Sequence, residues 1–188
     1  MAGLPGTGKS ALARALAQRV EGVVLDKDFI RASIFPRRSI EYSTEQDDFV
    51  VELMLRVAEY LLRCEPERVV ILDGRPFSKK YQVEAVVAFC RRVSTPWRII
   101  ECTCSEKVAL RRLRTDAAGG RHVAENRNAE LYREVKAQFQ GIRRPTLVVR
   151  TALRLETCVE KVEEYLRPRV TPARPVAKKR QGRGTRPK

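Results

Sequence analysis

The fold is decided at the beginning of the chain, where residues 3–10 read Gly3-Leu4-Pro5-Gly6-Thr7-Gly8-Lys9-Ser10. This stretch matches the pattern G-x-x-x-x-G-K-[ST] in full. Glycines let the backbone adopt positive φ and curl around a phosphate, so that successive N–H groups point inward. The Ala- and Leu-rich helix expected over Lys9–Val20 directs the positive end of its dipole at the same anion. The stretch therefore predicts a phosphate-binding loop, and we expect all eight residues to contact a nucleotide.

Two side chains of this loop and one acid elsewhere predict a site for ATP with Mg²⁺. Lys9 is expected to bridge the β- and γ-phosphates, and the Ser10 hydroxyl to ligate the metal. The run RVVILDG at residues 68–74 ends a buried strand with Asp73, which is expected to hold Mg²⁺ through water. The alternative is that Asp73 only caps the following turn. Motor ATPases place a glutamate next to activate water, and here Gly74 takes that place, so the sequence favours phosphoryl transfer to an acceptor over hydrolysis.

Outward from the loop, short apolar runs alternate with helical patterns, which is typical of a parallel α/β sheet covered by helices on both faces. The expected strands are Val23–Asp26, Val69–Asp73, Arg98–Thr103 and Thr146–Val149. The expected helices are Lys9–Val20, Thr44–Cys64, Ser78–Val93, Ser105–Arg114, Asn128–Gly141 and Glu156–Leu166. In the second of these helices, Thr44 and Asp47 are placed as a capping pair.

Composition limits the classes of protein that remain. The chain has 188 residues with 43% hydrophobic and 32% charged residues, which suits one folded domain. It has no apolar run of the ~18 residues that a membrane span needs and no apolar stretch of a secretory signal. Its five cysteines are an odd number scattered among apolar residues, which favours reduced thiols in a cytoplasmic protein over a disulfide framework.

The net charge of +15 is concentrated at the C-terminal end. Residues 168–188 contain eight Lys or Arg, four prolines and no acid. We expect a kinase-like domain over residues 1–167, with a lid at about 115–127, followed by a disordered basic tail at 168–188. Such a tail can bind nucleic acid through its phosphates without sequence preference.

An acceptor site is predicted beyond the second strand. A carboxylate just past Val23–Asp26 lies at the ligand-binding edge of an open α/β sheet. Asp28 could accept a hydroxyl proton during phosphoryl transfer, and Arg31, one turn later, could bind a phosphate or carboxylate of the acceptor. Alternatively, Asp28 caps a short helix and Arg31 is a solvated charge. Arg75 also lies at this edge, either facing the acceptor or on the surface.

Together, the loop, the Asp28-x-x-Arg31 pair, the VVILDG strand and an arginine-rich lid resemble the P-loop kinase group that contains polynucleotide 5′-kinases, zeta toxins and chloramphenicol phosphotransferase. Many bacterial members of that group are described only as AAA-family ATPases or kinases. The resemblance spans about residues 3–166. It implies a three-layer P-loop fold with strand order 2-3-1-4-5, and it implies that Asp28 is the base and Arg31 the acceptor contact.

The resemblance also implies lid arginines that stabilise charge on the transferring group. The candidates are Arg111, Arg112, Arg114, Arg121 and Arg127. Arg112-Leu113 fits the start of the usual R-L-x-x-R run, but Asp116 stands at its last position. We prefer Arg114 and Arg121 for this catalytic role, and the alternative is that any of the five is only solvated.

One departure from this fold is the strand expected directly before the loop, because only Met1 and Ala2 precede Gly3. We expect a vacant place in the sheet between Val69–Asp73 and Arg98–Thr103, with Met1 and Ala2 as the end of the first strand. We also expect the upstream nucleotides, translated in frame, to encode roughly five to eight residues rich in Val, Ile and Leu.

Three functions follow from these observations. The favoured one is an ATP-dependent kinase that transfers the γ-phosphoryl group to a hydroxyl of a small molecule or nucleotide. The second is a nucleic-acid 5′-end kinase or nucleic-acid-associated ATPase, for which the basic tail is the only added argument. The third is a truncated, non-catalytic nucleotide-binding protein.

Overall fold

The sheet is parallel and is built in two halves. The computed structural model describes residues 1–118 and 128–167. Strand β1 (Val23–Asp26) pairs with β2 (Val70–Asp73), and β3 (Ile99–Thr103) pairs with β4 (Thr146–Arg150). All four expected strands are confirmed, with bounds that differ from the expected ones by one residue at most.

The first two residues join the halves. The backbone N–H of Ala2 donates to the carbonyl of Ile100 at 2.8 Å, and the N–H of Cys102 donates to the carbonyl of Ala2 at 2.8 Å. On the other side, the amino group of Met1 donates to the carbonyl of Leu72 at 2.9 Å. Residues 1–2 thus lie between β2 and β3, and the expected strand order is confirmed.

Beyond these two residues the halves are separated by a cavity. Its volume is about 330 Å³, and its lining includes Val69–Leu72 from the edge of β2 and Arg98–Ile100 from the edge of β3. This is the place where the sequence predicted a gap in the sheet. The sheet is therefore bridged only near the carboxyl ends of its strands, where the loop at residues 3–10 begins.

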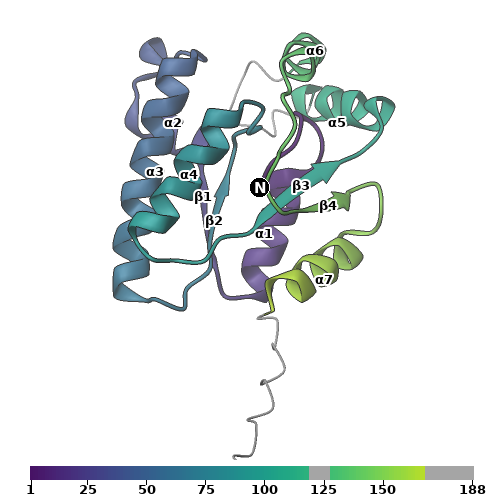
Figure 1. The fold of residues 1–188 in the computed structure, drawn as a ribbon. Helices are drawn as coiled ribbons and strands as arrows, with labels where there is room; N and C mark the ends of the chain where they lie inside the picture. Colours follow the sequence, from purple (N-terminus) through teal and green to yellow (C-terminus); the bar gives the residue numbers. More distant parts are fainter. Residues whose placement is uncertain (119–127, 168–188) are drawn as a thin grey trace, which may run out of the picture.

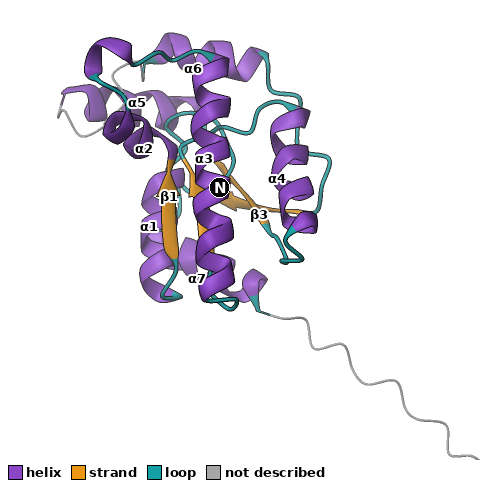
Figure 2. Cartoon of the chain, turned by 90° about the vertical axis from the view of Figure 1, so that its left-hand side faces the viewer, coloured by secondary structure: helices purple, strands orange, loops and turns teal. Residues whose placement is uncertain are grey.

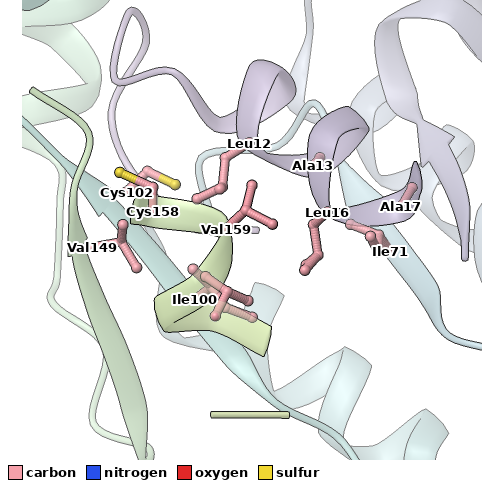
Figure 3. Close-up of a cluster of buried hydrophobic side chains, with 11 residues drawn as sticks. Leu12, Ala13, Leu16, Ala17, Ile71, Ile100, Cys102, Val149, Cys158 and Val159 are labelled. Atoms are coloured by element: carbon pink, nitrogen blue, oxygen red, sulfur yellow. The ribbon is translucent and has the colours of Figure 1, made fainter. Parts of the chain in front are cut away.

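Helices cover both faces of the sheet and make it a three-layer structure (Figure 1). Helices α1 (Lys9–Arg19) and α7 (Leu155–Leu166) lie on one face, where Leu12, Leu16 and Val162 belong to a cluster of buried residues shared with β2, β3 and β4 (Figure 3). Helices α3 (Thr44–Cys64) and α4 (Lys80–Arg92) cover the opposite face. The strands are apolar on both sides because both sides are covered.

The remaining helices lie toward the carboxyl ends of the strands. Helix α2 (Lys27–Ile34) follows β1 without a break, and α5 (Glu106–Ala118) packs against α6 (Ala129–Ala137). A short 3-10 turn, Arg37–Ser39, lies between α2 and α3. Figure 2 shows α2, α5 and α6 gathered at one end of the molecule, away from the opposite ends of α1, α3 and α7. This end contains the loop at residues 3–10.

The six expected helices are confirmed, with several corrections to their ends. Helix α4 begins at Lys80 and not at Ser78, and α6 ends at Ala137 and not at Gly141. Helix α3 is capped by Ser43, whose Oγ accepts from the N–H of Gln46 at 3.1 Å, and not by the expected pair of Thr44 and Asp47. Helix α5 continues to Ala118, into the range expected for the lid. The rest of that lid, residues 119–127, and the basic tail at 168–188 lie outside the described residues. No helix of the described chain is both long enough and apolar enough to cross a bilayer.

The close contact between the loop and the sheet can be tested at Gly3. Its φ is +127°, and a Cβ at this position would lie 2.3 Å from the carbonyl oxygen of Cys102. Gly141 also has a positive φ, +71°, but open space around it. We expect Gly3→Ala to destabilise the fold by roughly 2–5 kcal/mol more than Gly141→Ala, because strain and a backbone clash add at Gly3 alone. Thermal or urea unfolding of the two variants measures the difference, and equal losses would contradict the close seating of the loop.

Candidate active site

The loop at residues 3–10 has the backbone that its glycines predict. Gly3, Gly6 and Gly8 all have positive φ, and a Cβ on Gly6 would meet the carbonyl oxygen of Ala109 at 2.6 Å. Gly6 is thus pressed against α5, as Gly3 is against β3. A side chain at either position would push the loop out of its seat.

Polar side chains hold the loop closed. The hydroxyl of Thr7 and the amino group of Lys9 both donate to the carbonyl of Leu4, at 2.7 and 2.9 Å. The hydroxyl of Thr151, just past β4, donates to the carbonyl of Thr7 at 2.6 Å. Lys9 is buried. Its hydrogen bond to the Leu4 carbonyl holds its positive charge against the backbone of the loop.

Helix α1 begins directly in the loop and has an open N-terminus. Its N-cap is Gly8, in the left-handed conformation at φ 80°, and no side chain of the described residues caps the first turn. The first turn also has no acidic residue. The positive end of the helix dipole is therefore directed at the loop without a neutralising carboxylate on that turn, which suits an anion.

Two carboxylates end the neighbouring strands β1 and β2, where Asp26 and Asp73 are paired in register. The Asp26 carboxylate caps α2, accepting from the N–H groups of Asp28 and Phe29 at 3.0 and 3.3 Å. Burial and the charge of Asp73 raise the pKa of Asp26 above its usual value. The cap of α2 is thus Asp26, and the alternative interpretation of Asp28 as the helix cap is wrong.

Asp73 fits the metal-side role predicted for it. Its side chain is 1% exposed, and neither carboxylate oxygen has a hydrogen-bond partner among the described residues. A buried carboxylate without donors is costly, and a cation is the partner that removes the cost. Ser10 lies in the first turn of α1 and lines a cavity whose lining does not include Asp73. A hydroxyl and a carboxylate are oxygen ligands of the kind that Mg²⁺ prefers, so both residues stay candidates for the predicted metal site.

Beyond β1 lies a cluster of four charged residues, Lys27, Asp28, Arg31 and Asp47, called the charge cluster below. The ammonium of Lys27 lies 2.6 Å from Oδ1 of Asp47 and 3.4 Å from Oδ1 of Asp28. The guanidinium of Arg31 contacts the same two oxygens, at 3.4 Å for Asp28. Burial lowers the pKa of Lys27 to about 8 and also lowers the pKa of Arg31. The cluster ties α2 to the first turn of α3.

A single cavity of about 520 Å³ joins the charge cluster to the loop. Its lining includes Gly8, Lys9 and Ser10 from the loop and Asp28 and Arg31 from the cluster. The structure thus brings together the phosphate loop and the acceptor-side residues that the sequence singled out.

Of the two preferred lid arginines, Arg114 and Arg121, the described residues include only Arg114. Arg112 donates to the hydroxyl and carbonyl oxygens of Thr151, at 3.2 and 2.7 Å, and lies beside Gly8 in the lining of the cavity. Arg114 is exposed, donates to the carbonyl of Leu110 at 3.4 Å and is not brought into the cavity. Arg121 lies outside the described residues. Among the described lid candidates, Arg112, the first arginine of the partial R-L-x-x-R run, lies beside the loop.

Sequence reasoning also missed Lys27 and Asp47. Lys27 is 5% exposed and sits between two acids in the run Asp26-Lys27-Asp28, a pattern that hinted at a buried ion pair. Nothing in the local pattern distinguishes Asp47 from an ordinary acid in the first turn of a helix. Arg75, the other arginine considered, is buried against Asp48 and the ring of Tyr81 and is not part of the cavity lining.

Comparison with known proteins agrees with this geometry. No curated protein is significantly similar in sequence. APS kinase of Mycobacterium tuberculosis, solved with AMPPNP and APS, is 17% identical over 88% of this chain and 94% of its own, with a TM-score of 0.66. A gluconokinase of Sinorhizobium meliloti 1021 is 14% identical over 88% and 92%, with a TM-score of 0.60. The family model described as "AAA domain" matches residues 1–145. The chain therefore belongs to this AAA domain family and has the fold of the P-loop kinases.

Proposed function

We propose that the protein is an ATP-dependent phosphotransferase that moves the γ-phosphoryl group of ATP to the hydroxyl of a small molecule or nucleotide. The observation on which this depends is the single cavity that joins the phosphate loop to Asp28. A carboxylate in the same cavity as the phosphate loop can take the proton of an acceptor hydroxyl. The structural relatives support the same class, since one was solved with AMPPNP and APS and another is a gluconokinase.

The nucleotide half of the reaction uses the loop and α1. When ATP binds, its triphosphate replaces the Leu4 carbonyl as the hydrogen-bond partner of Lys9. The first turn of α1 faces the phosphates. Ser10 and Asp73 would hold Mg²⁺, which would supply positive charge to stabilise the phosphates. Arg112, held at the loop by Thr151, is the described arginine best placed to face the nucleotide.

The acceptor half uses Asp28. Its carboxylate takes the proton of the acceptor hydroxyl as the hydroxyl oxygen bonds to the γ-phosphorus, and the bond from that phosphorus to the β–γ bridging oxygen breaks. ADP leaves with the electron pair of that bond. Lys27 and Arg31 each lie 3.4 Å from Oδ1 of Asp28 and hold this carboxylate in position.

An acceptor screen with γ-labelled ATP and Mg²⁺ tests the proposal. The panel contains nucleosides, sugars and amino alcohols beside 5′-hydroxyl oligonucleotides. Label on a small molecule supports the proposal. Label on oligonucleotides alone would replace it with a nucleic-acid end kinase, and label released only to water would indicate an ATPase.

The first variant to test is Lys9→Ala. We expect it to lower transfer by at least ~10³-fold while the protein stays folded, because the charge that stabilises the transferring phosphoryl group is lost. Lys107→Ala, on the exposed side of α5, is the matched control and should behave as wild type. Transfer that persists in Lys9→Ala would rule out the phosphate loop as the catalytic element.

The second variant is Asp28→Asn. A general base acts on the acceptor and contributes about 10²–10⁴-fold, so kcat should fall by that factor while the affinity for ATP changes little. Steady-state kinetics and nucleotide binding separate the two effects. A variant with normal kcat and a lower Tm would show that Asp28 serves only to hold α2 to α3.

The third variant is Asp73→Asn, which separates function from stability. Removing a buried charge that has no donor should raise the stability of the nucleotide-free protein by about 1–3 kcal/mol, or a few degrees in Tm. The same change should abolish the additional rise in Tm that Mg²⁺ with ATP gives the wild type. A lower Tm, with the response to Mg²⁺ and ATP intact, would count against Asp73 as the metal-side acid.

A further inference from the structure

Helix α3 lies at the outside of the molecule and packs on the sheet with one of its faces. On that face Val50, Met54 and Ala58 recur every four residues and are buried. Figure 1 shows α3 at the left-hand margin of the molecule, and in Figure 2 the helix lies along the side that faces the viewer. The remainder of such a helix is normally polar, because only one stripe of it meets the core.

A second apolar row runs beside the buried one and is exposed. It consists of Phe49, Leu53, Val57 and Tyr60, called the outer row below, which are spaced by four, four and three residues and so share a face. Phe49, Val57 and Tyr60 are 50%, 44% and 59% exposed, and Leu53 is half-buried. The ring of Phe35 extends the row, since its centroid lies 5.9 Å from that of Phe49. Single exposed apolar residues are ordinary, but a continuous row of them indicates a contact surface.

Charged residues follow the outer row, and their sign changes at the middle of the helix. Glu45 and Glu52 lie in the N-terminal half of α3, and Arg56 and Arg63 lie in the C-terminal half. All four are exposed, and their spacings of seven, four and seven residues place them along one line. Glu59, in the C-terminal half, is already paired with an arginine of α4. A partner of one charge would therefore suit only half of this helix.

We propose that a second copy of this chain docks on the outer row, with the two α3 helices antiparallel across a two-fold axis near Met54. Glu45 and Arg63 are each nine positions from Met54, so they face each other between the copies. Glu52 and Arg56 are each two positions away and face each other in the same manner. A parallel pair would instead place acid against acid and base against base. The charges of α3 are thus complementary to α3 itself, but only in the antiparallel direction.

The same two-fold axis covers the apolar side chains. Phe49 of one copy meets the region of Tyr60 of the other, and Leu53 and Val57 lie near the axis in both copies. A closed contact of this kind uses one patch twice and leaves no open end. Helix α3 has 21 residues, a length of about 31 Å, so the contact is at the small end of specific interfaces. We therefore expect a dimer that dissociates in the micromolar range, and this inference does not depend on the proposed kinase function.

The ion pair that exists within one copy does not prevent this exchange. Glu52 and Arg56 are 2.8 Å apart on the same helix, and their side chains are 63% and 72% exposed. An exposed pair of this kind contributes little to stability, so replacing it by pairs between copies costs little.

Analytical ultracentrifugation of the full chain from about 1 to 100 µM, at ~0.15 M salt, tests the dimer. We expect the mass to rise from one copy to two over this range. Val57→Glu places a charge at the centre of the outer row and should raise the Kd of the dimer by at least about tenfold. Monomers at every concentration would overturn the proposal and leave the outer row to a different partner.

Exchange of charges on α3 tests the antiparallel direction. One variant combines Arg56→Glu with Arg63→Glu, and a second combines Glu45→Arg with Glu52→Arg, so that each carries a single sign along the line. We expect each variant alone to be monomeric. An equimolar mixture should form the dimer again, because opposite signs then meet at all four positions.

A matched control makes the same change of net charge elsewhere. Lys107→Glu combined with Arg133→Glu alters exposed residues of α5 and α6 and should leave the dimer intact. Loss of the dimer in this control, or its persistence in both charge variants of α3, would overturn the proposed contact. A mixture of folded variants that stays monomeric would overturn the antiparallel pairing. Circular dichroism separates loss of the dimer from loss of the fold, and Val57→Glu decides the question if a charge variant does not fold.

Discussion

The active end of the molecule depends on the two hydrogen bonds that join Ala2 to β3. They fix the start of the phosphate loop to the carbonyl and amide groups of Ile100 and Cys102, and Gly3 then passes within contact distance of the Cys102 carbonyl. The other features of the site depend on these two hydrogen bonds of Ala2. The positions of Lys9, of the first turn of α1 and of Gly6 on α5 follow from the loop. On its entering side the loop is supported by these bonds, by the bond of Gly3 to the carbonyl of Pro76 and by the bond of Met1 to the carbonyl of Leu72.

Charge is distributed unevenly around these hydrogen bonds. Asp73 is buried without donors, while Lys27 and Arg31 share one carboxylate oxygen. Such arrangements cost stability in a protein that has only to fold, and they are typical of sites where a ligand completes the pairing. These costly charge arrangements are confined to one end of the molecule. The apolar cluster shared by α1, α7 and the strands contains no charged side chain, and it stabilises the sheet and helices that carry the polar residues.

Local patterns predicted most of the fold and the centre of the site. The glycines and Lys9 lie within eight residues, and each strand is a short apolar run, so neighbouring residues alone define them. Asp28 and Arg31 are one helical turn apart and were found for the same reason. Asp47 could not be found this way, because its role arises from a contact with Lys27 across 20 positions and two helices. The cap of α3 was misassigned because Ser43 and Thr44 are both good capping residues, and only the backbone distinguishes them.

The hydrogen bond from Thr151 to the Thr7 carbonyl determines when the site can exist. It links residues 144 positions apart, and the same hydroxyl accepts from Arg112. Closing a contact of such sequence separation costs more chain entropy than closing a local one, so we expect it to form late in folding. The loop is locked only when β4 has joined the sheet. A chain that lacks β4 has the residues of the loop without the hydrogen bond from Thr151, so we expect the loop to reach its final geometry only after that strand is in place.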